Sequence, residues 1–189
     1  MIYLEVITRH LTTRPTMLAR NQHSLDKQTD KDFIQTILVD EDGMGIEIAN
    51  QMLADYAPHL IGEWIWILDD DDLCAYPTLV ASLKQIDRRR PSPAWNIDVV
   101  MVRNDLLQHG VLPDRRQWGV VPASGHVAMS CFIVRRRVFQ EYAHHFAGGV
   151  GADHRFATAI LTGTKRDAIH WWDVVAMRCQ RVSSEGAPE

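Results

Sequence analysis

The sequence predicts an α/β domain with a mainly parallel central sheet flanked by helices. Short apolar segments alternate with segments of helical spacing in the first half of the chain, which is the pattern of consecutive βαβ units. Two of the apolar segments end in acidic clusters, at Asp40–Asp42 and Asp69–Asp72. Because ligands of parallel sheets bind beyond the carboxyl ends of the strands, both clusters should face one crevice.

The expected strands are short and apolar, and turn residues separate them from the expected helices. The strands are Tyr3–Thr8, Phe33–Val39, Trp64–Leu68, Asp98–Val102, Met129–Val134 and one or two closing strands in "AIHWWDVVAMRCQRV". Helices are expected from Pro15, over Ile46–Tyr56 after turns at Gly43 and Gly45, from Pro77 to Arg88–Arg90, and in "RRVFQEYAHHF" and "DHRFATAIL". The turn-rich stretch from Asn104 to Ser124 is interpreted as a functional loop region.

Length and composition indicate one globular domain. The chain has 189 residues, 46% of them hydrophobic and 23% charged, and a formal net charge of −4 that does not attract nucleic acid or anionic membranes. It lacks the ~20-residue apolar stretch that spans a bilayer, and its N-terminus does not read as a secretory signal. Three widely spaced cysteines fit a reduced, cytoplasmic protein. The tail 183–189 is expected to be disordered.

Four consecutive aspartates, Asp69–Asp72, follow the apolar segment "WIWIL". Adjacent carboxylates repel one another, so the arrangement costs free energy unless a cation lies among them. No lysine or arginine flanks them, and carboxylate oxygens are the ligands of Mg²⁺ and Mn²⁺. The cluster is therefore a candidate metal site. The alternative is a solvated group of acids, or a cap on the next helix.

The first acidic cluster, in "LVDEDGMG", offers a different chemistry. Uracil and guanine carry N–H groups that a base pocket must satisfy, and a carboxylate accepts such hydrogen bonds. Asp40 and Asp42 are therefore candidates for binding a base. A turn built by Asp–Gly chemistry is the alternative.

Several stretches, taken in order, resemble family-2-like glycosyltransferases with the GT-A fold, in a small, minimal version. They are "RPTMLARNQHSLDKQTDKDFIQTILVDEDG", "IANQMLADYAPHLIGEWIWILDDDD", "AMSCFIVRRRVFQEY" and "GADHRF", and they cover most of Ile2 to Phe156. The resemblance implies a single GT-A-like domain over 1–182, with a nucleotide-sugar-binding half at 1–103 and an acceptor or catalytic half at 104–182.

The resemblance also implies a role for each matching residue. Thr8 and Arg9 would lie near the nucleotide, and Asp40, with Asp42 nearby, would face the base. Asp69 and Asp70 would lie against the nucleotide sugar, and Asp69, Asp71 and Asp72 would form the D-x-D region that holds Mn²⁺ or Mg²⁺ on the diphosphate. Asp153 would be the general base.

Two departures from the family pattern bear on the site. The glutamate that often precedes the base is Ala152 here, which affects how the acceptor is positioned more than the base itself. The family's "ARN" is "IAN", so a cation often aimed at the pyrophosphate is missing and metal must carry more of that charge.

Three further side chains are candidates with plain structural alternatives. His170 would complete the metal site from a late strand, as in some GT-A enzymes, or it packs beside the tryptophans that follow it. His126 and Trp118 are candidates for contacting the sugar or acceptor. A loop histidine and an aromatic covering the core are the respective alternatives.

The sequence thus predicts a metal-dependent glycosyltransferase of the hexosyltransferase type. It would move a sugar from a UDP- or GDP-linked donor to an unidentified acceptor hydroxyl, with inversion. A nucleotidyltransferase on a related sheet is the second hypothesis, and it would want a glycine-rich phosphate loop near the first strand. A catalytically inactive nucleotide-sugar or glycan-binding module is the third.

Overall fold

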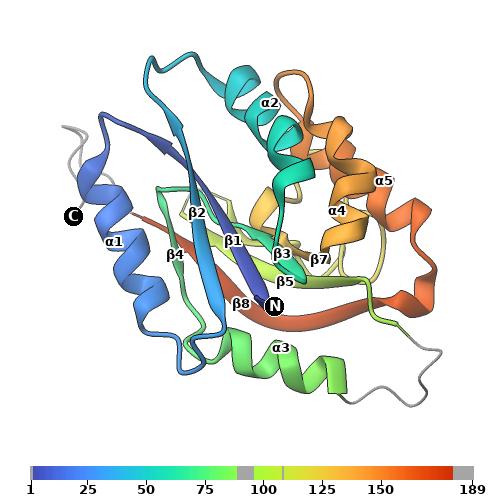
Figure 1. Cartoon of the computed structure of the whole chain (residues 1–189). Helices are drawn as coiled ribbons and strands as arrows, with labels where there is room; N and C mark the ends of the chain where they lie inside the picture. The colour runs from blue at the N-terminus through green and yellow to red at the C-terminus, as the bar shows by residue number, and fades with distance from the viewer. Residues whose placement is uncertain (1, 89–95, 108, 181–189) are drawn as a thin grey trace.

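The structure is a computed structural model that describes residues 2–88, 96–107 and 109–180 (Figure 1). One mixed sheet forms its centre, with the strand order β2-β1-β3-β7-β5-β8-β4 and β6 paired to β5. The strands are β1 (Leu4–Leu11), β2 (Phe33–Asp40), β3 (Trp64–Ile67), β4 (Asp72–Cys74), β5 (Val99–Leu106), β6 (Gly110–Leu112), β7 (Phe132–Arg135) and β8 (Ile169–Cys179).

The direction of the strands agrees with a mainly parallel sheet. The pairs β1–β2, β1–β3 and β5–β8 are parallel, whereas β7, β4 and β6 run antiparallel to their neighbours. Five of the eight described strands therefore point the same way. The ends of β1, β2 and β3 meet at one edge of the sheet, and both acidic clusters lie there.

Helices cover both faces of the sheet (Figure 1). They are α1 (Pro15–Asp26), α2 (Ile46–Tyr56), α3 (Leu79–Arg88), α4 (Arg136–Tyr142) and α5 (Ala152–Gly163). One hydrophobic core cluster includes side chains of α2, α4 and α5, and a second includes side chains of α1 and α3. The alternation of side chains along a strand explains "WIWI": Ile65 and Ile67 enter the first cluster, and Trp64 and Trp66 enter the second.

The connection from α2 to β3 is held by a buried carboxylate that the sequence analysis did not single out. Glu5 on β1 is fully buried, and its Oε2 accepts hydrogen bonds from the backbone N–H groups of Ile61 and Gly62, both at 2.8 Å. A Cβ at position 62 would lie 2.5 Å from the Glu5 Cβ, so only glycine fits this approach. The start of β3, and with it the position of the acidic segment, is fixed to β1.

Several expected elements differ from the observed ones. β1 continues to Leu11 because it pairs with β2 along its whole length, and β5 continues to Leu106, into the predicted loop region. Residues Met129–Cys131 form a 3-10 turn before β7, and the closing segment is one strand, β8. The helix expected from Pro77 begins at Leu79, and Arg89, Arg90 and the tail 183–189 lie outside the described residues.

The strand β4 was not expected at all. It begins at Asp72, which the sequence analysis places in a cluster following a strand, and it pairs with the end of β8. A three-residue edge strand has no local pattern of its own, and pairing across 107 residues creates it. The acidic cluster therefore lies in a tight connection between two strands.

Candidate active site

The acidic segment is held by hydrogen bonds from two distant side chains and one distant backbone group. The Asn21 side chain on α1 donates to the carbonyl oxygens of Asp69 and Asp72, both at 2.9 Å. Past the end of β8, the backbone N–H of Gln180 donates to the carbonyl oxygen of Asp71 at 2.7 Å. The side chain of Gln180 donates to the carbonyl oxygen of Asp70 at 2.8 Å. These contacts fix the backbone, so the four carboxylates cannot move apart freely.

Three of these carboxylates have the geometry of a metal site. Asp69, Asp71 and Asp72 each offer one ligand oxygen, and the three oxygens lie within 4.8 Å of one another. Burial, and then the neighbouring aspartates, raise the pKa of Asp71 to about 6 and raise the pKa of Asp72 well above its usual value. A set of carboxylate oxygens that repel one another suits a hard divalent cation such as Mg²⁺ or Mn²⁺. The residues present therefore fit such an ion.

Basic side chains from the end of β1 reach part of the cluster. The Arg9 guanidinium binds Asp69 through two parallel hydrogen bonds, Nε to Oδ1 at 2.7 Å and Nη2 to Oδ2 at 2.5 Å. Burial alone would lower the pKa of Arg9, but the Asp69 carboxylate raises it above its usual value. The sequence analysis places Arg9 near the nucleotide but does not foresee this ion pair, because 60 residues separate the two partners.

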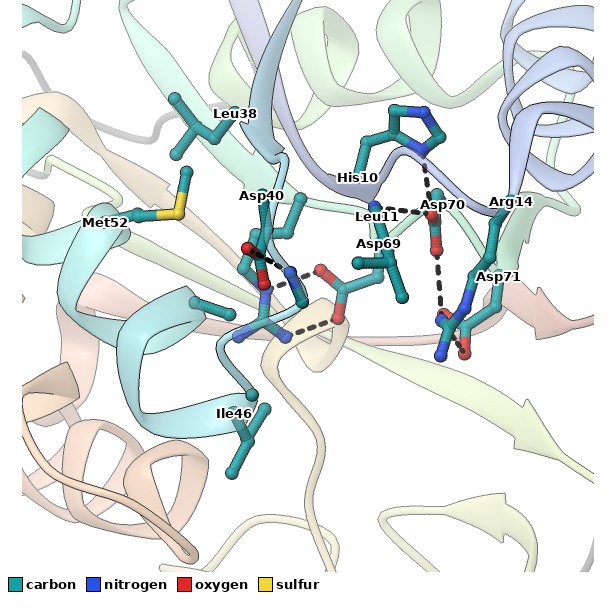
Figure 2. Close-up of a pocket in the computed structure, with 14 residues that line it drawn as sticks. His10, Leu11, Arg14, Leu38, Asp40, Ile46, Met52, Asp69, Asp70 and Asp71 are labelled. Atoms are coloured by element: carbon teal, nitrogen blue, oxygen red, sulfur yellow. Dashed lines mark hydrogen bonds and ion pairs between the residues drawn. The ribbon is translucent and has the colours of Figure 1, made fainter.

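Asp70 anchors the segment to β1. Its Oδ2 accepts hydrogen bonds from the His10 ring at 2.9 Å and from the Leu11 backbone N–H at 3.1 Å, and Oδ1 lies 3.4 Å from Arg14 (Figure 2). Arg14 lies 3.9 Å from Asp71, so Asp71 receives only a loose ion pair and Asp72 receives none among the described residues. The two acids with raised pKa values are the two that no cation pairs closely.

Two adjoining cavities open around the cluster, with volumes of about 350 and 340 Å³. Both are lined by Arg9, Ile46, Asp69 and Asp71. The first extends over Asp40, Leu38 and the turn at Gly43 and Gly45, and Figure 2 shows its lining. The second extends over Asp72, the 3-10 turn at Met129–Cys131 and the start of α5. Two of the three candidate metal ligands, Asp69 and Asp71, therefore lie where the two cavities meet, and Asp72 lines the second.

Of the two candidate base ligands, the structure places only Asp40 in the cleft. Asp40 lines the first cavity, and its Oδ1 accepts hydrogen bonds from the backbone N–H groups of Gly43 at 2.9 Å and Met44 at 3.2 Å. One carboxylate oxygen of Asp40 therefore forms the turn, as the alternative hypothesis predicts. No donor among the described residues binds its other oxygen, Oδ2. Asp42 is exposed and lines neither cavity.

Asp153 lies in the first turn of α5 and lines the second cavity, as Asp71 and Asp72 do. Its Oδ1 accepts a hydrogen bond from the His154 backbone N–H at 2.8 Å. One carboxylate oxygen thus serves the helix start. The structure brings Asp153 and the acidic segment to the same cavity although 81 residues separate Asp72 from Asp153 in the chain.

The structure places Thr8 in the interior, away from the cleft. It is fully buried, its hydroxyl accepts a hydrogen bond from the Gln35 side chain at 2.7 Å, and it lines neither cavity. Gln35 also binds Asn21, which holds the acidic segment. Thr8 therefore belongs to a buried polar network that reaches the acidic segment through Gln35 and Asn21.

The expectation that His170 completes the metal site is wrong in this structure. His170 pairs with Val100 near the start of β8, whereas Cys179, nine residues further on, is the residue beside Asp72. At ~3.3 Å per residue, nine residues of strand span on the order of 25–30 Å. His170 therefore lies far from the acidic segment, in agreement with the packing alternative.

The two candidate acceptor contacts also lie outside both cavities. Trp118 packs edge-to-face on Trp171 with ring centroids 5.0 Å apart, and the Arg103 guanidinium lies 4.5 Å from its ring. His126 is exposed in the loop before the 3-10 turn. Among the described residues of the predicted loop region 104–124, only Leu106 lines either cavity. Asn50, Met129, Met177 and Cys179 line the second cavity instead, and no local motif marks them.

The fold is similar to that of solved glycosyltransferase structures. No family model matches the chain, and no curated protein matches it significantly. TarS from S. aureus superimposes with a TM-score of 0.66 at 14% identity, over 94% of this chain and 36% of that one. TarS 1–349 in complex with UDP-GlcNAc gives a TM-score of 0.63 at 14% identity, over 97% of this chain and 60% of that one.

A mannosyltransferase is among these similar structures. PcManGT from Pyrobaculum calidifontis, in complex with GDP-Man and Mn²⁺, gives a TM-score of 0.51 at 16% identity, over 89% of this chain and 56% of that one. The chain thus spans between about a third and three fifths of the length of these structures. It has a glycosyltransferase-like mixed α/β fold. None of its described helices is long and apolar enough to cross a membrane.

Burial of Asp71, together with its neighbouring carboxylates, predicts a pH dependence of stability in metal-free buffer. The pKa of Asp71 is about 6 in the folded chain and 3.8 as its ordinary value, so its stabilising effect is present below pH 4 and is lost as pH rises through 6. Replacing Asp71 by Asn should therefore stabilise the metal-free protein at pH 7. Because 41% of the Asp71 side chain is exposed, water screens the effect, and we expect roughly 1 kcal/mol.

Urea unfolding at pH 4 and pH 7 measures this difference. Asp42→Asn is the matched control, since Asp42 is exposed and outside the cleft. The Asp71 variant should gain stability over wild type at pH 7 but not at pH 4. A gain of the same size at both pH values, or in both variants, would show that the pKa of Asp71 is not raised in the folded chain as described.

Proposed function

We propose that this chain is a metal-dependent glycosyltransferase of the GT-A type, which transfers a sugar from a nucleoside diphosphate sugar to an acceptor hydroxyl with inversion. The proposal rests on the cluster of Asp69, Asp71 and Asp72, of which Asp69 and Asp71 line both cavities and Asp72 lines the second. One cavity ends at Asp40 and the other at Asp153. A donor has two parts, a base and a sugar, joined by a diphosphate, and this arrangement offers a place for each.

The donor base would lie in the first cavity. Asp40 would accept an N–H group of uracil or guanine through the oxygen that the turn leaves unused. The diphosphate would lie at the junction, held with Mn²⁺ or Mg²⁺ by the three aspartates. The ion, when bound, neutralises negative charge on the departing diphosphate and helps to orient it. Two similar structures, with UDP-GlcNAc and with GDP-Man and Mn²⁺, support this class of donor.

Arg9 would add the cation that the "IAN" stretch lacks. Of the five N–H groups of its guanidinium, two bind Asp69 and one binds the Asn50 side-chain oxygen. The remaining two are available to phosphate oxygens, since Arg9 lines both cavities. Ala49, at the position of the missing arginine, cannot do this.

In the second cavity Asp153 would act as the general base. Its carboxylate takes the proton of the acceptor hydroxyl while that oxygen forms a bond to the anomeric carbon. The bond from this carbon to the diphosphate oxygen breaks on the opposite face, which inverts the configuration and releases the nucleoside diphosphate. The proton stays on Asp153 until solvent removes it, and no covalent enzyme intermediate is needed.

The two alternatives predict different products. A nucleotidyltransferase would release pyrophosphate from a nucleoside triphosphate, but "TRHLTTRP" at the end of β1 has no glycine-rich phosphate loop. A binding module would release nothing, and Ala152 in place of the family's glutamate favours it. Two parallel reactions with Mn²⁺ separate the three hypotheses, one with UDP-GlcNAc or GDP-mannose and one with UTP or GTP and a sugar 1-phosphate. Release of UDP or GDP in the first reaction supports sugar transfer. Pyrophosphate in the second reaction, or no product in either, contradicts it.

The position of Asp40 predicts which acid selects the base. Asp40→Ala should weaken binding of the preferred nucleoside diphosphate by about tenfold, because a hydrogen bond to a charged group is lost. It should also reduce the preference over ADP, since adenine has no N–H at the equivalent ring nitrogen. Asp42→Ala is the matched control and should bind like wild type. Calorimetry with UDP, GDP and ADP measures both, and equal behaviour of the two variants would remove base selection from Asp40.

The role of Asp153 predicts a separation of chemistry from folding. Asparagine accepts the His154 hydrogen bond almost as well as aspartate, so Asp153→Asn should keep its melting temperature and its donor affinity. It should lose ~10²-fold or more in transfer, because asparagine does not accept a proton. Steady-state release of nucleoside diphosphate measures the loss. Turnover within a few-fold of wild type in a folded variant would end the assignment of the base.

A further inference from the structure

Three side chains form a continuous hydrogen-bonded link from the acidic segment to the loop before α5. Asp69 binds the Arg9 guanidinium through two bonds, and Arg9 Nη1 donates to Asn50 Oδ1 at 2.6 Å. The Asn50 amide Nδ2 then faces the backbone carbonyl oxygens of Gly148 and Gly149 at 3.4 and 3.5 Å. The link crosses from β1 to α2 and then to the opposite wall of the second cavity.

Each step of the link fixes the orientation of the next. The parallel bonds to Asp69 leave the Arg9 guanidinium no freedom to rotate. A guanidinium only donates hydrogen bonds, so it determines that the oxygen of the Asn50 amide points towards it. The two amide hydrogens must then point to the loop. Rotating the amide by 180° would place its oxygen against two carbonyl oxygens and its hydrogens against a cation.

The loop that receives this link runs from Ala147 to Gly151 and ends at the start of α5. Arg155 on α5 closes it from within, because its guanidinium donates to the carbonyl oxygens of Ala147 and Val150, both at 3.1 Å. Arg155 belongs to the same helix as Asp153, so it gives the loop its shape but does not fix it relative to the acidic segment. The 99%-buried Asn50 makes that second connection.

We infer that Asn50 is a positioning residue that couples the acidic segment to the loop carrying Asp153. This rests on the proposed function, in which the donor diphosphate lies at the acidic segment and Asp153 takes the acceptor proton. Because the base and the leaving group act on opposite sides of one carbon, their separation has to be held. Asn50 holds it through one side chain that contacts both Arg9 and the loop, and it acts on the reaction through these two contacts.

The variant Asn50→Asp tests the link at its second step. Aspartate has the size of asparagine and keeps an oxygen for Arg9, but it has no amide hydrogens for the two glycine carbonyl oxygens. The loop should therefore lose its hold on the acidic segment while Arg9 keeps its partner. Gln51→Glu is the matched control, because it adds the same charge at the next position of α2, where the Gln51 side chain binds the exposed Asp55 and no other described residue.

Hydrogen–deuterium exchange without substrate gives the first readout. In Asn50→Asp the backbone N–H groups of 148–154 should exchange about five- to tenfold faster than in wild type and in Gln51→Glu, with α3 unchanged. Arg9→Lys, which keeps the charge but cannot bind Asp69 and Asn50 together, should show the same change and decides the question if Asn50→Asp does not fold. Exchange equal to that of the control in both variants overturns the inference.

Kinetics with UDP-GlcNAc or GDP-mannose and Mn²⁺ give the second readout. Asn50→Asp should lower kcat by about 10- to 100-fold with KM for the donor within about threefold of wild type, since the base is displaced and the donor is not. Faster loop exchange with an unchanged kcat would overturn the coupling to Asp153. If wild type consumes neither donor, the proposed function fails, and the exchange experiment still decides whether Asn50 holds the loop.

Discussion

Three carboxylate oxygens held within 4.8 Å of one another repel, and the connection between β3 and β4 keeps them there. The free energy for this comes from the surrounding fold. Asn21 and Gln180 hold the backbone of the segment from two sides, and the pairing of Asp72 with Cys179 fixes its far end. These contacts come from α1 and from the residue after β8, so the geometry of the segment depends on parts of the chain that are distant in sequence.

The cations near the cluster are arranged unevenly, and this matters for what the cluster can bind. Arg9 pairs tightly with Asp69, and His10 and Arg14 gather at Asp70 (Figure 2). Asp71 and Asp72 remain without a close cation among the described residues, and burial and then the neighbouring aspartates raise their pKa values. A full set of arginines would have neutralised the segment and left no electrostatic reason for a metal. The basic side chains thus hold Asp69 and Asp70 in place, whereas the charges of Asp71 and Asp72 favour a divalent ion.

Local pattern was enough to predict the strands β1, β2 and β3, the helices α1 and α2, and the placement of both acidic clusters at one edge of the sheet. These features depend on alternation and turn residues, which neighbours in sequence determine. The order of motifs correctly indicated a glycosyltransferase-like mixed α/β fold, and in that fold Asp153 lines the same cavity as Asp71 and Asp72. It could not be predicted that Asp40 lines the first cavity and Asp42 does not, because this depends on how the turn at Gly43 is oriented.

Contacts between distant residues account for the remaining differences. β4 exists because β8 pairs with it, and the length of β8 places His170 at the far end from Asp72. Thr8 is two residues from His10 on β1, but only His10 lines a cavity. Thr8 is buried and binds Gln35 in the polar network that reaches the acidic segment. The link through Asn50 joins residues 9, 50 and 148, and nothing in a single window of sequence marks such a contact.

The central claim is that the acidic segment binds a divalent ion together with a nucleoside diphosphate. Calorimetric titration of the protein with UDP and with GDP, in Mn²⁺ and then in chelator, tests it most directly. If the ion bridges Asp69, Asp71 and Asp72 to the diphosphate, binding of the preferred nucleotide should be at least tenfold tighter in Mn²⁺, a difference of about 1.4 kcal/mol. Equal affinity with and without the ion would contradict the account.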